Sequence, residues 1–264
     1  MTNKVLSIDL DYLMGPTIEV QQEAETLHCE NATAKWETFF DRLPFKENQF
    51  YIDQGNLIFC YDAFLKSLTK NKKTPKVLFG YDHDSILYLI GKEENIDLIN
   101  IDHHDDVMHG SFVQGGESDE SGWRALEREL YYLKNHHWVN EGNWGAWLCI
   151  RDKLEAFTWI HNPESTNLDR NDFNIKLMGD GNVKYSYLTR YDYEFEDYNF
   201  DYIFVCLSPQ YMPMIHWHYF TIFIMAYEAI TGEKAKVISD RKFEYQFNHL
   251  NTHNEILHQR ANGG

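Results

Sequence analysis

Short apolar runs that end in polar residues alternate with segments of helical periodicity along much of the chain. The runs with the apolar, β-branched composition of buried strands are Val5–Leu10, Lys76–Gly80, Ile96–Ile101 and Tyr202–Leu207. Helical spacing of apolar residues follows in Ala32–Leu43, Ser85–Gly91, Gly122–His137 and His216–Thr231. Because buried parallel strands read as continuous apolar runs joined by helices, this alternation predicts a three-layer α/β/α fold with a mainly parallel sheet.

Two regions interrupt the alternation. Phe50–Asp62 has the pattern of two short strands around a turn at Gln54-Gly55-Asn56, which predicts an inserted hairpin or an antiparallel edge. Phe157–Tyr198 is rich in Asn and Asp turns, which predicts short strands and loops outside the central sheet. The polar tail His249–Gly264 is expected to end in disorder. Without repeats or low-complexity linkers, residues 1–264 are predicted to form a single domain.

The acidic balance of the chain limits its partners. The formal net charge is −17, from 41 Asp and Glu against 24 Lys and Arg. Nucleic-acid binding is driven largely by Lys and Arg that displace condensed counterions, so we expect no nucleic-acid partner. The same acidity favours cations and cationic groups as ligands. An aromatic share of 16% is far too high for a disordered chain, so the chain is expected to fold.

The sequence predicts neither export nor a membrane span. The N-terminal sequence MTNKVLSIDLDY places two aspartates where a signal peptide needs an apolar run. The most apolar helical stretch, His216–Thr231, would extend about 24 Å, which is short of a hydrocarbon core of ~30 Å. Four cysteines without a CxxC pair indicate buried, reduced thiols. We therefore expect a cytoplasmic protein without a membrane partner.

The strongest chemical signal, DHHDD at positions 102–106, closes one of the predicted strands. In extended backbone alternate side chains share a face, so Asp102, His104 and Asp106 are expected to point into one cleft and His103 away from it. Carboxylate oxygens together with imidazole nitrogens suit manganese, iron or zinc better than magnesium or calcium. The alternative is a solvated acidic loop, but burying so many like charges without a cation would be costly.

Two further segments place similar residues at the ends of predicted strands. Asp9 and Asp11 share one face of the first strand, at the carboxyl end where open sheets bind ligands. The alternative for this pair is a capping and turn role. His83 stands where a strand opens into a helix and can supply one nitrogen, although a single histidine there is usually structural.

These three segments resemble motifs of the arginase/deacetylase superfamily, in particular of the ureohydrolases. GYDHDS, DHHDD and SIDLD stand here for the family's GGDHS, DAHxD and SxDxD. The resemblance implies an arginase-like fold with two Mn²⁺ ions bridged by Asp9 and Asp102. It further implies that the remaining ligands are His83 and Asp106 for one ion, and Asp11 and His104 for the other.

Two departures from the ureohydrolase pattern bear on fold and substrate. The SxDxD strand follows the other motifs in ureohydrolases but opens this chain, which predicts a circular permutation. Enzymes that act on free arginine have an Asn two residues after the last Asp of DAHxD, where it helps to hold the α-carboxylate. Met108 occupies that position here, so a grip on a free α-carboxylate is not expected.

A narrower resemblance accommodates both departures. The motifs SIDLDY and DHHDD, with EGNW at 141–144 and LSPQYMP at 207–213, are similar to those of the arginase-like peptide arginases. Those enzymes convert arginine side chains of ribosomally made peptides to ornithine, which implies a precursor peptide as partner and urea as the second product. The alternative for Asn143-Trp144 and Ser208-Pro209 is a packed aromatic residue and a turn.

The resemblance also implies roles within the site. Asp106 would carry a proton to the leaving amine, and Glu141 and Gln210 are candidates to line the pocket of the cationic guanidinium. We assign Asp106 and Glu141 to the catalytic set, and Met108, Asn143 and Gln210 to the substrate-binding set. Two other functions stay open: a ureohydrolase of small molecules such as arginine or agmatine, and a metal-stabilised peptide-binding protein without turnover. The oligomeric state is also open.

Overall fold

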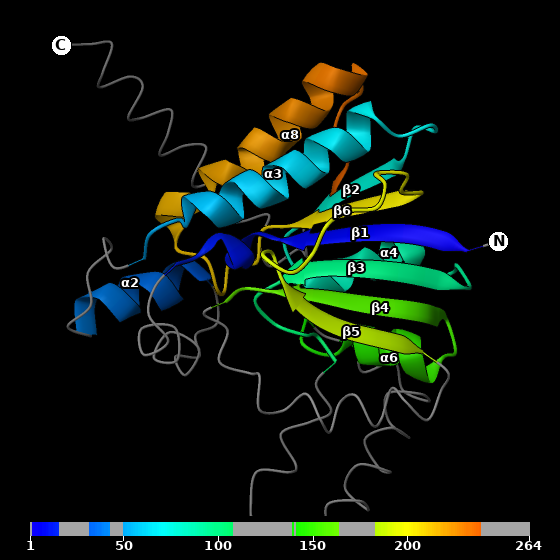
Figure 1. The fold of residues 1–264 in the computed structure, drawn as a ribbon. Helices are drawn as coiled ribbons and strands as arrows, with labels where there is room; N and C mark the ends of the chain where they lie inside the picture. Colours follow the sequence, from blue (N-terminus) through cyan, green and yellow to red (C-terminus); the bar gives the residue numbers. More distant parts are fainter. Residues whose placement is uncertain are drawn as a thin grey trace, which may run out of the picture.

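The computed structural model of the protein describes residues 2–15, 32–42, 50–107, 139, 141–163 and 183–238. Three features predicted from the sequence lie outside these residues: the helix Gly122–His137, the tail His249–Gly264 and Met108. The strands that carry the candidate metal ligands all lie within them, and their arrangement can be followed in Figure 1.

The centre of the fold is a seven-stranded sheet in which every strand pair is parallel. Its spatial order is β5-β4-β3-β1-β6-β2-β7, so β1 lies in the middle (Figure 1). The strands are Asn3–Asp9 (β1), Lys76–Gly80 (β2), Ile96–Asp102 (β3), Leu154–His161 (β4), Lys184–Thr189 (β5), Tyr202–Cys206 (β6) and Val237–Ile238 (β7). The four apolar runs form β1, β2, β3 and β6, and the prediction of a mainly parallel sheet is confirmed.

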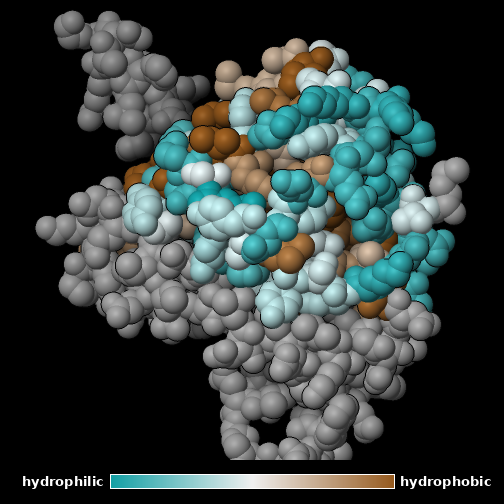
Figure 2. Space-filling model, in the orientation of Figure 1, coloured by the Kyte–Doolittle hydropathy of each residue, from teal (hydrophilic) through white to brown (hydrophobic). Residues whose placement is uncertain are grey.

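Helices cover both faces of this sheet and complete three layers (Figure 1). The helices on one face are α2 (Ala32–Arg42), α3 (Gln54–Thr69) and α8 (His218–Thr231), and those on the other are α4 (Leu87–Ile90) and α6 (Trp144–Ile150). Figure 2 shows hydrophobic surface over α8, where Ile222, Met225 and Ile230 are exposed. Among the described residues, no helix combines the length and apolar character needed to cross a bilayer.

Two hydrophobic cores lie between the layers. Leu6 of β1 packs in one core with Phe64 of α3 and Phe220 of α8. Its neighbour Val5 packs in the other core, with Trp144 of α6. Because consecutive residues of β1 enter different cores, the central strand is buried on both sides, which explains its continuous apolar run.

The segment predicted as a hairpin, Phe50–Asp62, instead contains the start of α3. Asp53 caps this helix, since its side-chain oxygen accepts a hydrogen bond from the backbone N–H of Asn56 at 2.8 Å. Gly55 and Asn56 therefore belong to the first helical turn rather than to a β-turn. Buried residues then recur at helical spacing, at Asn56, Cys60, Ala63, Phe64 and Ser67.

The region Phe157–Tyr198, predicted to lie outside the sheet, supplies one of its strands and most of another. β4 pairs with β3, and β5 pairs with β4, both in parallel register. The residues of β5 are partly or fully exposed, and its sequence KYSYLT alternates aromatic with polar side chains. It lacks the apolar run of the inner strands because, among the described strands, it pairs on one side only.

The topology of the sheet defines where a ligand is expected to bind. Crevices for ligands form in open parallel sheets where the connections of adjacent strands leave toward opposite faces. The connection after β1 contains α2 and α3 on one face, and the connection after β3 contains α6 on the other. β1 and β3 are neighbours, with Ile8 paired to Ile101. The carboxyl ends of these two strands therefore form the expected site.

Candidate metal centre

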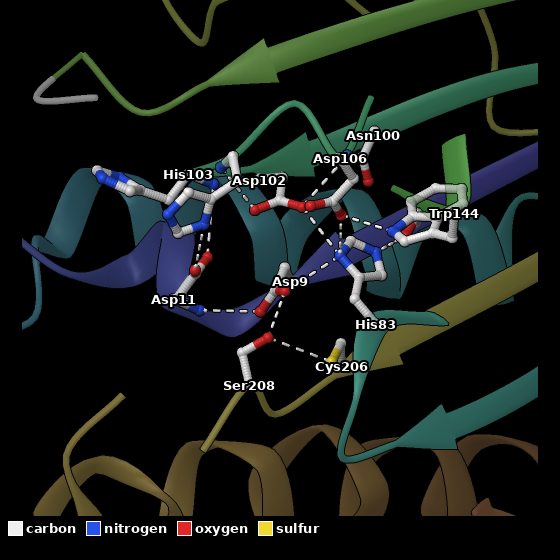
Figure 3. A network of polar contacts seen from close by, with 12 residues as sticks. Asp9, Asp11, His83, Asn100, Asp102, His103, Asp106, Trp144, Cys206 and Ser208 are labelled. Atoms are coloured by element: carbon white, nitrogen blue, oxygen red, sulfur yellow. Dashed lines mark hydrogen bonds and ion pairs between the residues drawn. The ribbon is translucent and has the colours of Figure 1, made fainter. Parts of the chain in front are cut away.

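The carboxyl ends of the central strands bring the six predicted metal ligands together (Figure 3). They are Asp9 at the end of β1, Asp11 in the following turn Leu10–Leu13, His83 after β2, Asp102 at the end of β3, and His104 and Asp106 in the loop after β3. The four carboxylates are at most 4% exposed. Burying four like charges is costly unless cations or protons compensate them.

Three carboxylates converge on one nitrogen of His83. Its Nδ1 atom lies 3.1 Å from Asp9 Oδ2, 2.9 Å from Asp102 Oδ2 and 2.7 Å from Asp106 Oδ2. Nδ1 carries at most one proton, so it cannot satisfy three carboxylate oxygens at once. The other ring nitrogen, Nε2, lies 2.7 Å from Ser7 Oγ. A divalent cation among these oxygens would supply the missing positive charge, and the donor set therefore fits a metal ion.

A second group of ligand atoms lies beside the first. Asp9, His83 and Asp102 form the first group, in which each residue offers one ligand atom within 4.8 Å of the others. Asp11, Asp102 and His104 form the second group by the same measure. His104 Nδ1 lies 3.1 Å from Asp11 Oδ2. Two groups that share one carboxylate, Asp102, are compatible with a pair of neighbouring cations.

Burial and mutual repulsion oppose the ionisation of these carboxyl groups in the metal-free protein. Burial, followed by the charges of Asp106 and Asp9, raises the pKa of Asp102 to about 8. Burial also raises the pKa of Asp11 and of Asp106. Burial lowers the pKa of His83, but attraction by Asp106 and Asp102 outweighs it and raises that pKa well above its usual value. In the metal-free protein, bound protons therefore offset the negative charges of the cluster. A bound divalent cation would offset the same charges.

Uncharged groups outside the cluster hold four of its side chains in orientation (Figure 3). The contacts are Asn100 Nδ2 to Asp102 Oδ2 at 3.2 Å, Trp144 Nε1 to Asp106 Oδ2 at 2.6 Å, Ser208 Oγ to Asp9 Oδ2, and Ser7 Oγ with His83 Nε2 at 2.7 Å. Such contacts orient a ligand without neutralising it, and outer hydrogen bonds of this kind tune the affinity of metal sites.

The backbone at Asp106 adopts a positive φ of 53°, which is uncommon for residues other than glycine. Two residues of α6 hold it in place. The backbone N–H of Gly145 donates to Asp106 O at 3.0 Å, and the Trp144 side chain donates to its carboxylate. A Cβ atom at position 145 would lie 3.0 Å from the same carbonyl oxygen, so a larger residue would disturb this approach. The EGNW motif thus contacts the cluster through Asp106.

Three residues predicted to bind substrate or take part in catalysis, Asn143, Glu141 and Gln210, are described by the structure and lie outside the cluster. Asn143 directly precedes α6, and its backbone oxygen accepts a hydrogen bond from Trp147 N at 3.0 Å. Glu141 is exposed, and Gln210 is partly exposed in the turn after β6. No hydrogen bond or ion pair between described residues joins Glu141 or Gln210 to the six ligands. Their roles stay predictions, and so does that of Met108.

Some side chains that contact the cluster were not predicted to do so. Trp144 and Ser208 lie in the EGNW and LSPQYMP motifs, for which a packed aromatic residue and a turn were the alternatives. Both residues also bond a ligand carboxylate. Tyr211, in the same motif as Ser208, packs on His104 with ring centroids 4.9 Å apart. Lys35 of α2 lies over Tyr211, and no pattern marks it because a helical lysine is usually exposed.

Comparisons of the chain with models of protein families, with curated proteins and with solved structures find no match. The arginase-like relationship and the circular permutation therefore stay predictions. The fold and the site together place the protein in a class that is defined by chemistry rather than by family. The protein has a parallel α/β sheet with a buried cluster of carboxylates and imidazoles at its carboxyl edge, and this donor set suits divalent cations.

Replacing Trp144 with phenylalanine is expected to weaken Mn²⁺ binding by roughly tenfold, because loss of an outer hydrogen bond to a metal ligand typically has this effect. The variant keeps an aromatic ring against His83, whose centroid lies 4.8 Å from that of Trp144. Trp147→Phe is the matched control, since Trp147 Nε1 lies in the same helix without a hydrogen-bond partner among the described residues. Calorimetric titration with Mn²⁺ that gave equal affinities for the two variants would contradict the role of Trp144.

Proposed function

We propose that the protein is a manganese-dependent hydrolase that converts peptidyl arginine to ornithine and urea in a ribosomally made precursor peptide. The observation that supports this most is the meeting of three separate motifs at one edge of the sheet. Asp9, His83 and Asp102, one from each motif, lie close enough to share a cation. The proposal includes a cytoplasmic location, where ribosomal precursors are made.

The donor set also supports manganese as the metal. Four carboxylates and two imidazoles combine hard oxygen with borderline nitrogen donors, which favours manganese over magnesium or calcium. Asp9, His83, Asp102 and Asp106 would hold one ion, and Asp9, Asp11, Asp102 and His104 the other. When bound, such a pair lowers the pKa of water so that a nucleophile is available near neutral pH.

The residues of the chain supply proton transfer and charge in this proposal. The Oδ2 atom of Asp106 contacts both Trp144 and His83, and in this proposal the Asp106 carboxyl group carries the proton that the departing amine requires. Glu141 would offset the charge of the guanidinium at the entrance. The net charge of −17 would attract a basic stretch of precursor, an effect that added salt weakens.

The proposal is tested by measuring urea release with Mn²⁺ from three substrates: an arginine peptide blocked at both ends, free arginine and agmatine. We expect urea from the blocked peptide, in step with ornithine formation, and none after chelation of the metal. Urea from free arginine or agmatine alone would favour a small-molecule ureohydrolase. No urea from any of the three would favour a binding protein without turnover.

Mn²⁺ is expected to raise the Tm of the protein, and to raise it more at pH 8 than at pH 6. In the metal-free protein the raised pKa values of Asp102 and His83 mean that the folded state binds more protons than the unfolded state. The contribution of Asp102 to the stability of the metal-free protein should therefore fall as pH rises between about 4 and about 8. Metal ligands must be deprotonated, so Mn²⁺ binds more tightly over the same range.

Thermal unfolding with Mn²⁺ and with a chelator, at both pH values, measures this difference. A metal-induced shift in Tm that was smaller at pH 8 than at pH 6 would contradict the assignment of these carboxyl groups as ligands.

A further inference from the structure

One side of the cluster is more open than the other. The side chain of His104, in the second ligand group, is 17% exposed, whereas the side chain of His83, in the first ligand group, is 2% exposed. The His104 side is therefore the more exposed side of the cluster. A substrate that approached from this side would meet the side chains that surround His104.

Tyr211 forms part of those surroundings. Its ring packs on the His104 ring, with centroids 4.9 Å apart and planes inclined by 53°. Its position is fixed by the turn after β6, in which Tyr211 N donates to Ser208 O at 2.9 Å. Ser208 in turn donates to Asp9, so the turn that carries Tyr211 is anchored on the cluster itself.

A buried ammonium group lies against the Tyr211 ring. Lys35 Nζ is 5.1 Å from the ring centroid, and Lys35 is 3% exposed. Lys35 covers this face of the ring, so a substrate group cannot stack on it. A cationic substrate would therefore meet Tyr211 at its edge, and the hydroxyl is the polar atom of that edge.

The Tyr211 hydroxyl is available for such a contact. It makes no hydrogen bond with any described residue, and Tyr211 is partly exposed. The hydroxyls of Tyr12 and Tyr185 also lack partners, but they are enclosed within the protein. The Nδ1 atom of His104, the residue on which the Tyr211 ring packs, lies 3.1 Å from Asp11 Oδ2, so the ring lies beside a carboxylate of the cluster.

We propose that Tyr211 contacts the substrate, and that its phenol oxygen accepts a hydrogen bond from an N–H of the guanidinium. This inference rests on the proposed function and adds a residue that determines specificity. A guanidinium has N–H donors in a planar fork and no acceptor, so its site must provide acceptors in fixed positions. Tyr211 would provide a neutral acceptor close to the carboxylates, which offset the positive charge.

The test compares Tyr211→Phe with the wild type and with Tyr88→Phe, which makes the same change at a residue that is 78% exposed. Three quantities are measured for each Mn²⁺-loaded protein: Mn²⁺ affinity, the Kd of a blocked arginine peptide and kcat/KM for urea release. Loss of a hydrogen bond to a charged group should weaken peptide binding and kcat/KM by about tenfold to a hundredfold. Mn²⁺ affinity should stay within about twofold, because the ring that packs on His104 is retained.

The outcomes separate this inference from the proposed function. Unchanged peptide Kd and kcat/KM in Tyr211→Phe would overturn the contact. An equal loss of Mn²⁺ affinity would overturn it as well, because Tyr211 would then act through His104. A wild type that binds the peptide without urea release would refute the hydrolysis, while the Kd of Tyr211→Phe would still test the contact. A wild type that neither binds the peptide nor releases urea would refute both.

Discussion

Replacing Asp102 with asparagine is expected to abolish Mn²⁺ binding and urea release together. Asp102 belongs to both groups of ligand atoms, so its loss disturbs both proposed cation positions. Asparagine keeps the shape of the side chain but brings no negative charge. The same double loss is expected for Asp102→Ala, which also removes the oxygen atoms.

The metal-free Asp102→Asn protein should nevertheless be at least as stable as the metal-free wild type. Asp102 is one of three carboxylates that crowd His83 Nδ1, and burial opposes its ionisation. A neutral side chain relieves part of that repulsion, while Asp9 and Asp106 still face the imidazole. A structural ion pair would behave in the opposite way, since removing one partner of such a pair is strongly destabilising.

Asp97→Asn provides the matched control for this variant. Asp97 lies near the start of β3, far along the strand from Asp102, and the change in chemistry is the same. Mn²⁺ titration, urea assay and thermal unfolding in chelator are compared for the two variants. Full activity in Asp102→Asn, or a large drop in its metal-free Tm, would refute the assignment of Asp102 as a shared metal ligand.

Arginine within a peptide is expected to be a better substrate than free arginine by about tenfold or more in kcat/KM, the size of one lost charge-assisted hydrogen bond. The resemblance to ureohydrolases implies that Met108 stands where free-arginine enzymes have the Asn that grips the α-carboxylate. An apolar side chain near a free carboxylate leaves that charge without a partner, whereas a peptide backbone carries no charge at the modified residue.

The measurement is kcat/KM for free arginine against arginine blocked at both ends within a short peptide. Met108→Asn is a useful companion variant, because it restores the polar residue of the free-arginine enzymes. It should narrow the difference between the two substrates. Equal or higher efficiency of the wild type on free arginine would support the small-molecule ureohydrolase instead.

The cluster of candidate metal ligands could be predicted from sequence because local patterns place these residues at the ends of strands. Asp9 and Asp102 each close an apolar run, and parallel strands end at one edge of the sheet, so neighbouring strands bring such residues together. His83 likewise lies just after the carboxyl end of a strand, β2. The order of the strands, however, depends on contacts between segments that are distant in the sequence. Neither β5 nor β7 has an apolar run that would predict its place in the sheet.

The remaining misinterpretations have identifiable physical causes. Gly55-Asn56 predicts a β-turn, but the preceding Asp53 side chain caps a helix. Asp, Asn and Gly are favoured both in β-turns and at helix N-termini, so the sequence alone does not distinguish the two. Trp144 and Tyr211 contact the cluster through packing between distant segments, which no spacing within one segment reveals. The prediction of a single domain over residues 1–264 stays a prediction.

The number of Mn²⁺ ions bound per chain at saturation tests the central claim most directly. Equilibrium dialysis followed by elemental analysis of the wild-type protein gives this number. The shared position of Asp102 between the two ligand groups predicts two ions per chain. One ion, or none, would contradict a two-metal centre.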